Sequence, residues 1–588
     1  MSNHKYRTHN CNELGEKNIN QKVRLSGWVY RKRDHGGILF LDLKDDYGIT
    51  QIVVNESLSI IYNGLSKISL ESVITVDGVV IKRKEDNINP NLDTGNIELD
   101  VSNYELQSLS GVLPFNMNDE SVNEDLRLEY RFLDLRKKKM HHNLRMRHQI
   151  IRKIRHIMYS MGFEEFQTPI LTSTSPEGAK DFLVPSRVHK NKYYALPQAP
   201  QQFKQLLMMS GFDKYFQIAP CFRDEDARAD RSPGEFYQVD IEMSFATQED
   251  VFKVTENLLY EVFSHFSSKK ISNNFTKIKY QDALLHYGTD KPDLRNPLQM
   301  QDVTNIFVKS SCTIFSEAIE KRNNVVKCIK ISNCNDLGRS FFKKATDFAQ
   351  EQGAKGLAYL KFNSNDDVHG PILKFMQDKD LQHLRSYMSV NSQEVLFFIC
   401  DVEKQVNQIG ARLISYLGEN LNLIEKDEYK FCWITDFPFF EMNEGKIVFS
   451  HNPFSMPDCN LMNIKDRLDY LKIQAQQYDI VCNGIEISSG AVRNHKIDLF
   501  YEVFRIAGYT KFDVDLKFPA MVKGLKFGPP PHAGIAPGLD RIIMLLLGNK
   551  NIRDVIAFPM NGQAQDVLMK SPCNLSDKEI KYLNIKNI

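Results

Sequence analysis

Apolar and polar residues alternate over short runs in the first part of the chain. The runs are residues 23–25, 38–43, 49–54, 73–80 and 97–99. Turn-forming stretches separate them, as at residues 34–37 (Asp-His-Gly-Gly) and 45–48 (Asp-Asp-Tyr-Gly). A period of two predicts strands, so this region should be a small all-β domain. Five strands at this spacing suit an OB-type barrel, although periodicity alone fits another small barrel equally well.

After the N-terminal domain, the spacing of apolar residues changes from that of strands to that of a helix. Apolar residues recur at helical spacing through residues 140–161, which predicts an amphipathic helix that Gly162 ends. Residues 163–171 suit a strand interrupted at Pro169, and residues 106–118 form a turn-rich linker. Residues 293–425 change to compact α/β alternation. With 588 residues, and about 150 per domain, the chain should hold three or four domains.

Composition narrows the classes of protein that remain. The 75 basic residues balance 74 acidic ones, which excludes a polybasic binder, so any contact with nucleic acid must use local patches. The ten cysteines lie scattered, without a C-x-x-C pair or zinc-ligand spacing, which indicates reduced structural thiols. The first residues lack the apolar core of a signal peptide, and no run reaches the 18 apolar residues of a membrane helix. We therefore expect a cytoplasmic protein without a membrane segment.

Two segments could bind a nucleotide. Residues 222–225 (Phe-Arg-Asp-Glu) form a charged loop between strand-like runs, where Arg223 suits a phosphate oxygen and an acidic group suits the adenine amine. Residues 534–541 (Gly-Ile-Ala-Pro-Gly-Leu-Asp-Arg) lead into an apolar helix, whose start would let Arg541 reach a terminal phosphate. Each is ambiguous alone, because charged hairpin loops are usually just solvated and a lone glycine motif is weak. Together they favour ATP binding.

Asp479 and Glu486 are candidate metal ligands in one strand-like run. Their odd separation puts them on opposite faces of a regular strand. A shared metal would therefore require a bulge, with Gly484 as the expected position.

A basic cluster in the N-terminal domain favours RNA binding. Residues 31–33 (Arg-Lys-Arg) accompany Phe40 and Gln51 on neighbouring predicted strands, where one side chain could stack on a base and the other read its edge. The alternative is a solvated charge run beside core aromatics.

These segments together resemble the three signature motifs of the class II aminoacyl-tRNA synthetases. Residues 162–171 look like motif 1 at the dimer interface, residues 222–225 like motif 2, and residues 534–541 like motif 3. Further segments are similar to bacterial-type aspartyl-tRNA synthetases: residues 174–187, 196–206, 290–295 and 551–559. Two more, residues 353–358 and 370–375, are similar to the insertion domain of those bacterial enzymes. The resemblance covers nearly the whole chain.

The resemblance implies an α+β multidomain fold with an N-terminal OB-type β-barrel, a class II antiparallel-sheet catalytic domain with helices, and an inserted α/β domain. We expect an anticodon-binding domain at residues 1–108, a linker at 109–123, the catalytic domain at 124–292 and 426–588, and the insertion at 293–425. The implied substrates are ATP, L-aspartate and tRNA, with Mg²⁺ as the metal and a homodimer formed through motif 1.

Site residues carry over from the resemblance position by position. Arg223 matches the main catalytic residue. Aspartate-binding positions are Glu177, Gln201, Gln202, Phe203, Lys204, Arg223, His451 and Arg493. ATP-binding positions are Arg223, Asp224, Glu225, Glu486, Gly538, Leu539, Asp540 and Arg541, and the Mg²⁺ ligands are Asp479 and Glu486. The anticodon readers are Arg33, His35, Phe40, Gln51 and Glu98.

The reaction of the family is in-line attack of the aspartate carboxylate on the α-phosphorus of ATP, followed by transfer of the aspartyl group to the terminal adenosine hydroxyl of tRNA. The first step needs no general base, because its nucleophile is already ionised. We expect Lys204 and Arg493 to pair with the side-chain carboxylate of aspartate, so that asparagine would leave two buried cations uncompensated.

Two departures from the family pattern bear on function. Ser232 stands where the family has glutamine before Pro233, and Gly234 looks like an extra residue, which affects contacts on the adenine side. His35 stands where strict aspartyl enzymes usually have leucine, and histidine there accompanies relaxed enzymes that charge both tRNA-Asp and tRNA-Asn. A relaxed enzyme is therefore predicted. The alternative is a discriminating aspartyl-tRNA synthetase that charges tRNA-Asp only, with His35 as an ordinary loop residue.

Other functions are disfavoured by particular segments. An asparaginyl or lysyl enzyme would share the barrel and the motifs but should lack the insertion and residues 177–181. A tRNA-independent asparagine-forming ligase would not need the barrel. A regulatory RNA-binding relative would not need the retained charged residues Arg223, Glu225, Asp479, Glu486 and Arg541.

Overall fold

The computed structural model describes residues 4–174, 179–332, 337–363, 367–459, 461, 464, 466–583 and 585. The chain forms two compact units, Met1–Val122 and Asn123–Ile588. Within the described ranges, no helix is both long and apolar enough to cross a membrane. Every cysteine in these ranges is a free thiol, as the scattered spacing predicts.

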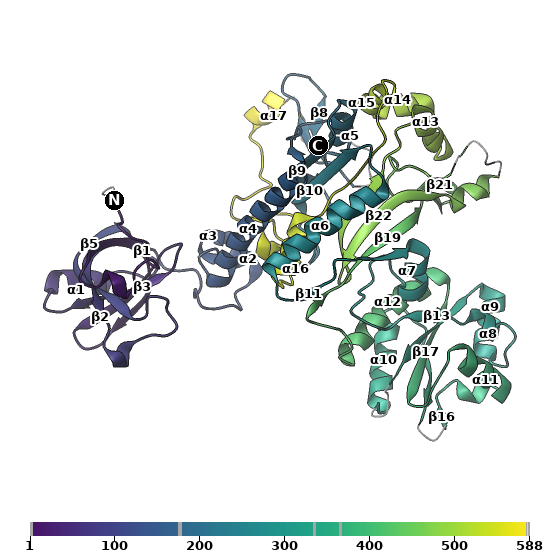
Figure 1. Ribbon diagram of the computed structural model, residues 1–588, viewed down its shortest axis with the longest axis horizontal. Coiled ribbons are helices and arrows are strands. Elements are labelled where there is room, and N and C mark those ends of the chain that lie inside the picture. Colours follow the sequence, from purple (N-terminus) through teal and green to yellow (C-terminus); the bar gives the residue numbers. More distant parts are fainter. Residues whose placement is uncertain are drawn as a thin grey trace. The chain divides into compact units, whose positions relative to one another are not determined.

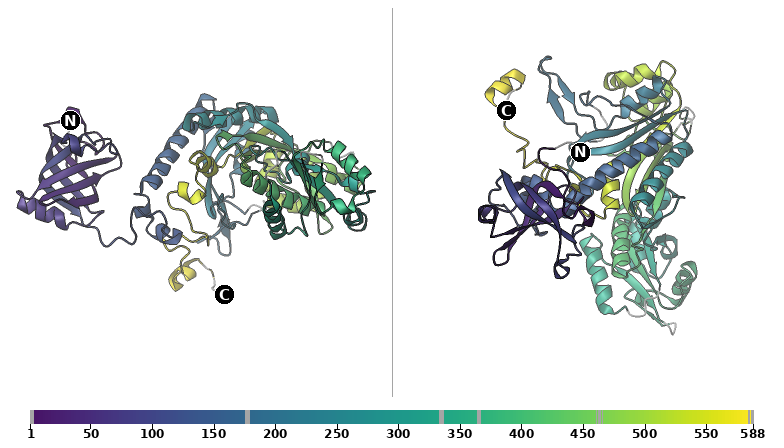
Figure 2. Two further views of the ribbon diagram at one scale, coloured as in Figure 1. Left: turned by 90° about the horizontal axis from the view of Figure 1, so that it is seen from below. Right: turned by 60° about the vertical axis from the view of Figure 1, so that its left-hand side comes forward.

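The first unit is a closed five-stranded barrel (Figure 1, Figure 2). Its elements are β1 (Lys22–Asp34), β2 (Ile38–Lys44), β3 (Ile49–Asn55), α1 (Ser59–Lys67), β4 (Val73–Lys82) and β5 (Ile97–Ser108). Alternate strand residues fill one core, such as Leu39, Leu41 and Leu43 of β2. Residues 106–108, which the turn-rich composition assigned to the linker and the family resemblance assigned to the barrel domain, belong to β5, because this strand runs further than its apolar alternation. The OB-type barrel is confirmed.

An eight-stranded sheet forms the centre of the second unit, in the order β12-β19-β22-β23-β24-β10-β9-β6. Its strands are β6 (Glu164–Glu165), β9 (Lys214–Arg223), β10 (Gly234–Ser244), β12 (Thr276–Lys279), β19 (Phe431–Pro438), β22 (Gln474–Cys482), β23 (Ile485–Val492) and β24 (His532–Ile535). Neighbouring strands are antiparallel except at the two edges, where β12 joins β19 and β6 joins β9 in parallel. This is the predicted antiparallel sheet with two short parallel edge strands.

Three helices cover one face of this sheet (Figure 1). They are α4 (Lys138–Ser160), α6 (Gln248–Phe266) and α16 (Leu539–Leu546). Their apolar residues share a core with alternate strand residues, such as Val239 and Ile241 of β10. Because strand side chains alternate, Asp240 and Glu242 of the same strand point to the opposite face. Polar side chains of the sheet can therefore lie together on that opposite face.

Shorter elements surround the sheet: α2 (Glu124–Glu129), α3 (Arg131–Asp134), β7 (Leu183–Pro185), β8 (Tyr193–Ala195), α5 (Gln201–Met209), β11 (Lys270–Ile271), α7 (Tyr280–Tyr287), β18 (Glu428–Tyr429), β20 (Phe440–Asn443), β21 (Lys446–Phe449), α13 (Ile497–Ile506), α14 (Lys511–Lys517), α15 (Pro519–Leu525), the 3₁₀ turn η6 (Ile552–Val555) and α17 (Asp577–Leu583). The strand predicted at residues 163–171 is wrong in extent. Only β6 pairs with the sheet, and residues 166–171 lie outside any strand. Pro169 has no N–H to give to a ladder, which is consistent with this early end.

A second sheet lies within residues 300–401, in the order β13-β14-β17-β15-β16. The elements of this region are β13 (Met300–Asp302), α8 (Thr304–Phe307), α9 (Thr313–Arg322), β14 (Val325–Ile331), α10 (Arg339–Glu351), β15 (Ala358–Phe362), β16 (Val368–His369), α11 (Asp378–Tyr387), β17 (Glu394–Asp401) and α12 (Glu403–Asn420). Lys327 of β14 is buried, and its Nζ donates to the carbonyls of Leu284 and Leu285 at the end of α7, at 3.2 Å each. The predicted α/β alternation is confirmed.

Candidate active site and nucleic-acid surface

A cavity of about 340 Å³ opens on the polar face of the eight-stranded sheet, within the usual size of small-molecule sites. Its walls come from α5, β10, β23, the start of α16 and the loop between β9 and β10, residues 224–233, which we call the motif 2 loop. Nine of the predicted site residues line it: Gln201, Lys204, Arg223, Glu225, Glu486, Arg493, Gly538, Asp540 and Arg541. The fold thus brings segments from distant parts of the sequence to one site.

Four buried charges lie together at this cavity. Lys204 Nζ lies 2.6 Å from Asp240 Oδ1 and 3.3 Å from Glu242 Oε2. Arg493 donates to both carboxylate oxygens of Glu242, at 2.8 and 3.1 Å. Burial raises the pKa of Asp240; burial would also raise that of Glu242, but Arg493 and Lys204 outweigh it and lower that pKa. We call these four residues the charge quartet.

The charge quartet corrects one expectation. Asparagine was expected to leave Lys204 and Arg493 as two uncompensated buried cations, and this is wrong, because β10 already supplies two carboxylates. The two acids lie at alternate positions of the buried stretch 239–243 of β10, whose other residues are apolar. That pattern was visible in residues 236–245 and is the signal that would have found them.

Two arginines from different motifs face the cavity. Arg223 ends β9, and its guanidinium carbon lies 4.9 Å from the ring centre of Phe236. Arg541 lies in the first turn of α16 and donates to the carbonyls of Glu486 at 2.7 Å and Asp230 at 3.2 Å. Guanidinium groups on two walls of one cavity suit a polyphosphate.

Several predicted residues belong to the scaffold. Asp540 accepts hydrogen bonds from Arg147 and from the N–H of Tyr237, the latter at 2.9 Å, so both its oxygens are engaged. Leu539 is fully buried in the core beneath the sheet. Asp224 forms a backbone bridge with Lys180 and does not line the cavity.

Gln202 and Phe203 also lie outside the cavity lining. They follow Gln201 on α5, and successive helical residues point in different directions, so Gln201 and Lys204 face the site while the two residues between them do not.

Ser232 and Gly234 shape the end of the motif 2 loop. Ser232 is buried and lines the cavity. Gly234 has a φ of +77°, in the left-handed region, and stands opposite Arg223 at the start of β10. The extra residue is thus a glycine that turns the loop into its returning strand.

Asp479 and Glu486 lie on neighbouring strands, which corrects the interpretation of one continuous run. Asn483 and Gly484 have φ of 52° and 82° and turn β22 into β23. The register shifts between Ile480 and Val481, so the bulge lies opposite these residues rather than at Gly484. Asn-Gly is a strong hairpin signal, and it should have divided the run.

The carboxyl group of Asp479 is strongly perturbed by its surroundings. Burial, followed by the charge of Glu486, raises the pKa of Asp479 to about 8. Its Oδ1 is buried and has no hydrogen-bond partner among the residues that the structure describes, while Lys291 Nζ lies 3.3 Å from Glu486 Oε2. Among the described residues, no group of three or more metal-ligating side chains gathers, either at this pair or elsewhere. A carboxylate pair with an orphaned oxygen has the chemistry of a divalent-cation site.

His451 lines a second cavity of about 640 Å³. This cavity shares Ala199, Arg223, Glu225 and Asn452 with the first, so the two adjoin. His451 itself is not among the residues that line the first cavity. Glu177 lies outside the described residues.

One face of the barrel collects the predicted RNA-reading residues. Arg33 donates to Gln51 Oε1 at 3.0 Å, and Gln51 donates to Glu98 Oε2 at 2.8 Å. His35 is exposed in the loop before β2, and its ring meets that of Phe40 edge-on at 5.9 Å. Asp42, which sequence reasoning missed, also accepts from Arg33, at 3.1 Å. Hydrogen bonds therefore link Arg33, Asp42, Gln51 and Glu98, whereas His35 and Phe40 meet through their rings.

Two family models match the chain. Residues 123–562 match "tRNA synthetases class II (D, K and N)", and residues 23–107 match "OB-fold nucleic acid binding domain". Among curated proteins, the chain is 54% identical to one from Rickettsia conorii and 53% identical to one from Rickettsia prowazekii. Both alignments cover 99% of this chain, and 98% and 97% of the relatives. Both relatives are named "Aspartate--tRNA(Asp/Asn) ligase".

Solved structures show the same fold at low identity. An asparaginyl-tRNA synthetase from Pyrococcus horikoshii, complexed with asparaginyl-adenylate, aligns with a TM-score of 0.58 at 19% identity, covering 96% of this chain and 99% of that one. An aspartyl tRNA synthetase from Entamoeba histolytica also gives 0.58 at 19% identity, covering 94% and 91%.

Proposed function

Because this chain belongs to the class II tRNA synthetases of the D, K and N group, we propose that it attaches L-aspartate to tRNA through an aspartyl-adenylate. The observation that carries the proposal is the meeting of Arg223 and Arg541 with the charge quartet in one cavity. The names of the Rickettsia relatives, at 53–54% identity over nearly their whole length, support aspartate as the amino acid. The catalytic centre is proposed within residues 124–292 and 426–588.

Arg223 is the residue that we propose acts on the reacting atoms. Arg223 lines both cavities. It can therefore contact an α-phosphate in the first cavity and also lie beside a ligand that enters through the second cavity. Its positive charge would stabilise the charge that develops as the aspartate carboxylate attacks and pyrophosphate leaves. Arg541, held by two backbone carbonyls, would bind the terminal phosphates.

Asp479 and Glu486 are the residues that we propose hold Mg²⁺. The orphaned Oδ1 of Asp479 and the raised pKa of that buried carboxyl fit a group whose charge a cation would compensate. When bound, the ion would neutralise phosphate charge.

The charge quartet suggests how aspartate is distinguished from asparagine. Lys204 has three N–H groups and Arg493 has five, more than Asp240 and Glu242 accept. Donors therefore remain for a substrate carboxylate, which only accepts. An asparagine amide would direct its own N–H groups at donors, and a site that leaves polar groups unpaired rejects a ligand strongly.

The barrel is proposed to read the anticodon, with Phe40, Gln51 and Glu98 on the bases that tRNA-Asp and tRNA-Asn share and His35 at the third base. The exposed position of His35 beside Phe40 is consistent with this role. Residues 162–171 are proposed to form a homodimer interface. The alternative is an enzyme that charges tRNA-Asp only.

Aminoacylation with radiolabelled aspartate on separate tRNA-Asp and tRNA-Asn transcripts tests the proposal. We expect both to be charged. Charging of tRNA-Asp alone would establish the discriminating alternative, and charging of neither would overturn the function. A His35→Leu variant should lose tRNA-Asn charging preferentially; equal charging of both by that variant would remove His35 from the specificity argument.

A further inference from the structure

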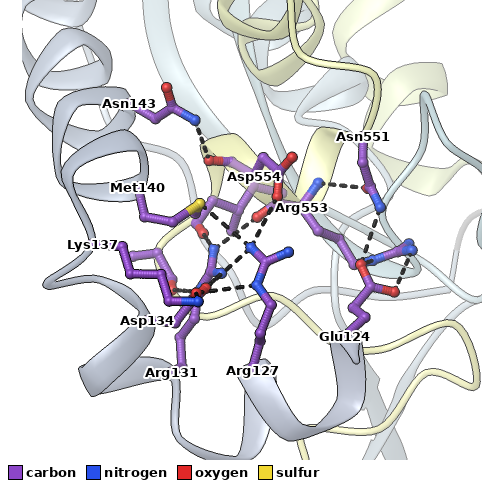
Figure 3. A network of polar contacts seen from close by, with 12 residues as sticks. Glu124, Arg127, Arg131, Asp134, Lys137, Met140, Asn143, Asn551, Arg553 and Asp554 are labelled. Carbon is purple, nitrogen blue, oxygen red and sulfur yellow. Dashed lines mark hydrogen bonds and ion pairs between the residues drawn. The ribbon is translucent and has the colours of Figure 1, made fainter. Parts of the chain in front are cut away.

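A network of polar side chains, in which Arg131, Asp134 and Asn143 are buried, holds residues 551–557, the segment around η6, against the first helices of the second unit (Figure 3). Asp134 is fully buried and accepts from Arg127 at 3.1 Å and from Arg131 at 2.7 Å. Arg127 also lies 3.4 Å from Asp554, and Glu124 accepts from Arg553 at 2.9 Å. We call the 551–557 segment the η6 strap.

Five successive carbonyl groups of the η6 strap accept side-chain hydrogen bonds. Arg131, 2% exposed, donates to the carbonyls of residues 553 and 556 at 2.8 Å and of residue 557 at 2.9 Å. Asn143 donates to the carbonyl of residue 554 at 3.1 Å, and Arg147 to that of residue 555 at 3.2 Å. Such an array fixes a backbone that lies outside strands and α-helices, and it takes buried charge to do so.

The strap meets the active site at one residue. Ile552 is buried and lines the first cavity, and its N–H donates to the carbonyl of Ala229 in the motif 2 loop at 2.8 Å. The next loop residue, Asp230, accepts from Arg541 through its carbonyl at 3.2 Å. Arg147 additionally holds Asp540, beside Arg541. The position of the strap therefore sets the wall formed by the motif 2 loop and the start of α16.

We propose that Arg131, supported by Asp134, is a positioning residue for ATP: it fixes the η6 strap so that Ile552 and the motif 2 loop hold the nucleotide side of the cavity. The inference rests on the proposed function. Lys204, Asp240 and Arg493 lie on α5, on β10 and directly after β23, none of which Arg131 contacts in its hydrogen bonds to the described residues. Loss of the network should therefore affect ATP more than aspartate.

The test is ATP–pyrophosphate exchange by the full-length chain with an Arg131→Met variant. We expect the KM for ATP to rise about tenfold and the KM for aspartate to change less than about twofold. Arg131→Lys should not restore the wild-type value, because one ammonium group cannot span three carbonyls as a planar guanidinium does. Lys153→Met is the matched control, since Lys153 also lies on a helix of the region, α4, but pairs with Glu261 instead.

Because Arg131→Met leaves Asp134 buried beside fewer cations, it could unfold the protein. Asn143→Leu removes one uncharged hydrogen bond to the same strap and should raise the KM for ATP about threefold at unchanged thermal stability. Hydrogen exchange at the amide of Ile552 should become faster in both variants. An unchanged KM for ATP in Asn143→Leu, or equal changes in the two KM values, would overturn the proposal. Absence of exchange in the wild-type protein would instead contradict the proposed function.

Discussion

Pairing within the charge quartet changes what each of its residues does. Lys204 and Arg493 cannot be regarded as two free cations awaiting aspartate, because Asp240 and Glu242 offset them within the same buried space. What the four residues provide is a fixed array of N–H donors. Removal of one partner would leave a buried charge without its counter-ion, which costs far more than the pair itself contributes.

An Arg493→Met variant tests this account of the quartet. We expect it to lose about 3 to 5 kcal/mol of unfolding free energy, because Glu242 stays buried beside Lys204 alone. The double variant Arg493→Met, Glu242→Met should regain most of that stability, yet its KM for aspartate should remain high. Urea unfolding and pyrophosphate exchange measure the two quantities. Recovery of aspartate binding in the double variant would show that Arg493 is not a substrate donor.

The buried Asp479 carboxyl predicts a pH dependence. Its pKa, raised by burial and by Glu486 from 3.8 to about 8, means that the folded protein holds a proton which the unfolded chain releases. The stability from this group is fully present below about pH 4 and is lost as pH rises towards 8. In EDTA, the difference in stability between Asp479→Asn and the wild-type protein should therefore grow in favour of the variant as the pH rises from about 4 to about 8. Above about pH 8 this difference, the margin, should stay constant.

Thermal melts of both proteins from pH 4 to 9 measure that margin, and other titrating groups cancel in the difference. Mg²⁺ should raise the melting temperature of the wild-type protein and leave the variant nearly unchanged. A margin that does not vary with pH would contradict the raised pKa.

At the scale of elements, the site depends on strands that approach very closely. β24 lies between β23 and β10, and an added Cβ on Gly534 would lie 1.9 Å from Glu242 Oε2 and 2.2 Å from the carbonyl oxygen of Ile241. The strands can bring motif 3 to the charge quartet only because this residue has no side chain.

Gly534→Ala should therefore affect stability and substrate binding together. We expect a loss of about 1 to 3 kcal/mol of unfolding free energy from the forced separation of β24 and β10. Displacement of Glu242 should raise the KM for aspartate as well. Gly356→Ala is the control, since a Cβ there meets no atom of the described residues within 4 Å. Wild-type behaviour of Gly534→Ala would mean that the sheet adjusts more easily than its contacts indicate.

Sequence patterns predicted these elements unequally. Period-two runs located the barrel strands, and helical spacing located α4 to within two residues of its ends. The patterns failed to locate two strand ends. The Asn483-Gly484 turn divides a run of residues that was predicted as one strand. The strand β6 is only two residues long, far shorter than predicted. Pairing of Lys204 and Arg493 with Asp240 and Glu242 could not be predicted, because it arises only when α5, β10 and the end of β23 come together.

At the scale of the whole molecule, the barrel is proposed to bind tRNA and the second unit to bind ATP and aspartate. The resemblance to a known family supplied this assignment. The residues alone favoured RNA binding and ATP binding as two separate functions. Arg131, Asp134 and Asn143 were not singled out, because a buried arginine network has no sequence period and its carbonyl partners lie over 400 residues away.

A barrel variant can separate the two halves of the reaction. Phe40→Ala removes an aromatic face that lies beside His35 on the barrel surface, and loss of one base stack should weaken tRNA charging by about 1 to 3 kcal/mol. Adenylate formation needs no tRNA contact at the barrel, so pyrophosphate exchange should stay at the wild-type rate. Ile60→Ala, which removes an exposed apolar side chain from α1, is the control. Parallel losses in both assays would indicate misfolding, whereas unchanged charging would exclude Phe40 from the tRNA contact and leave the Arg33–Gln51–Glu98 chain to carry recognition.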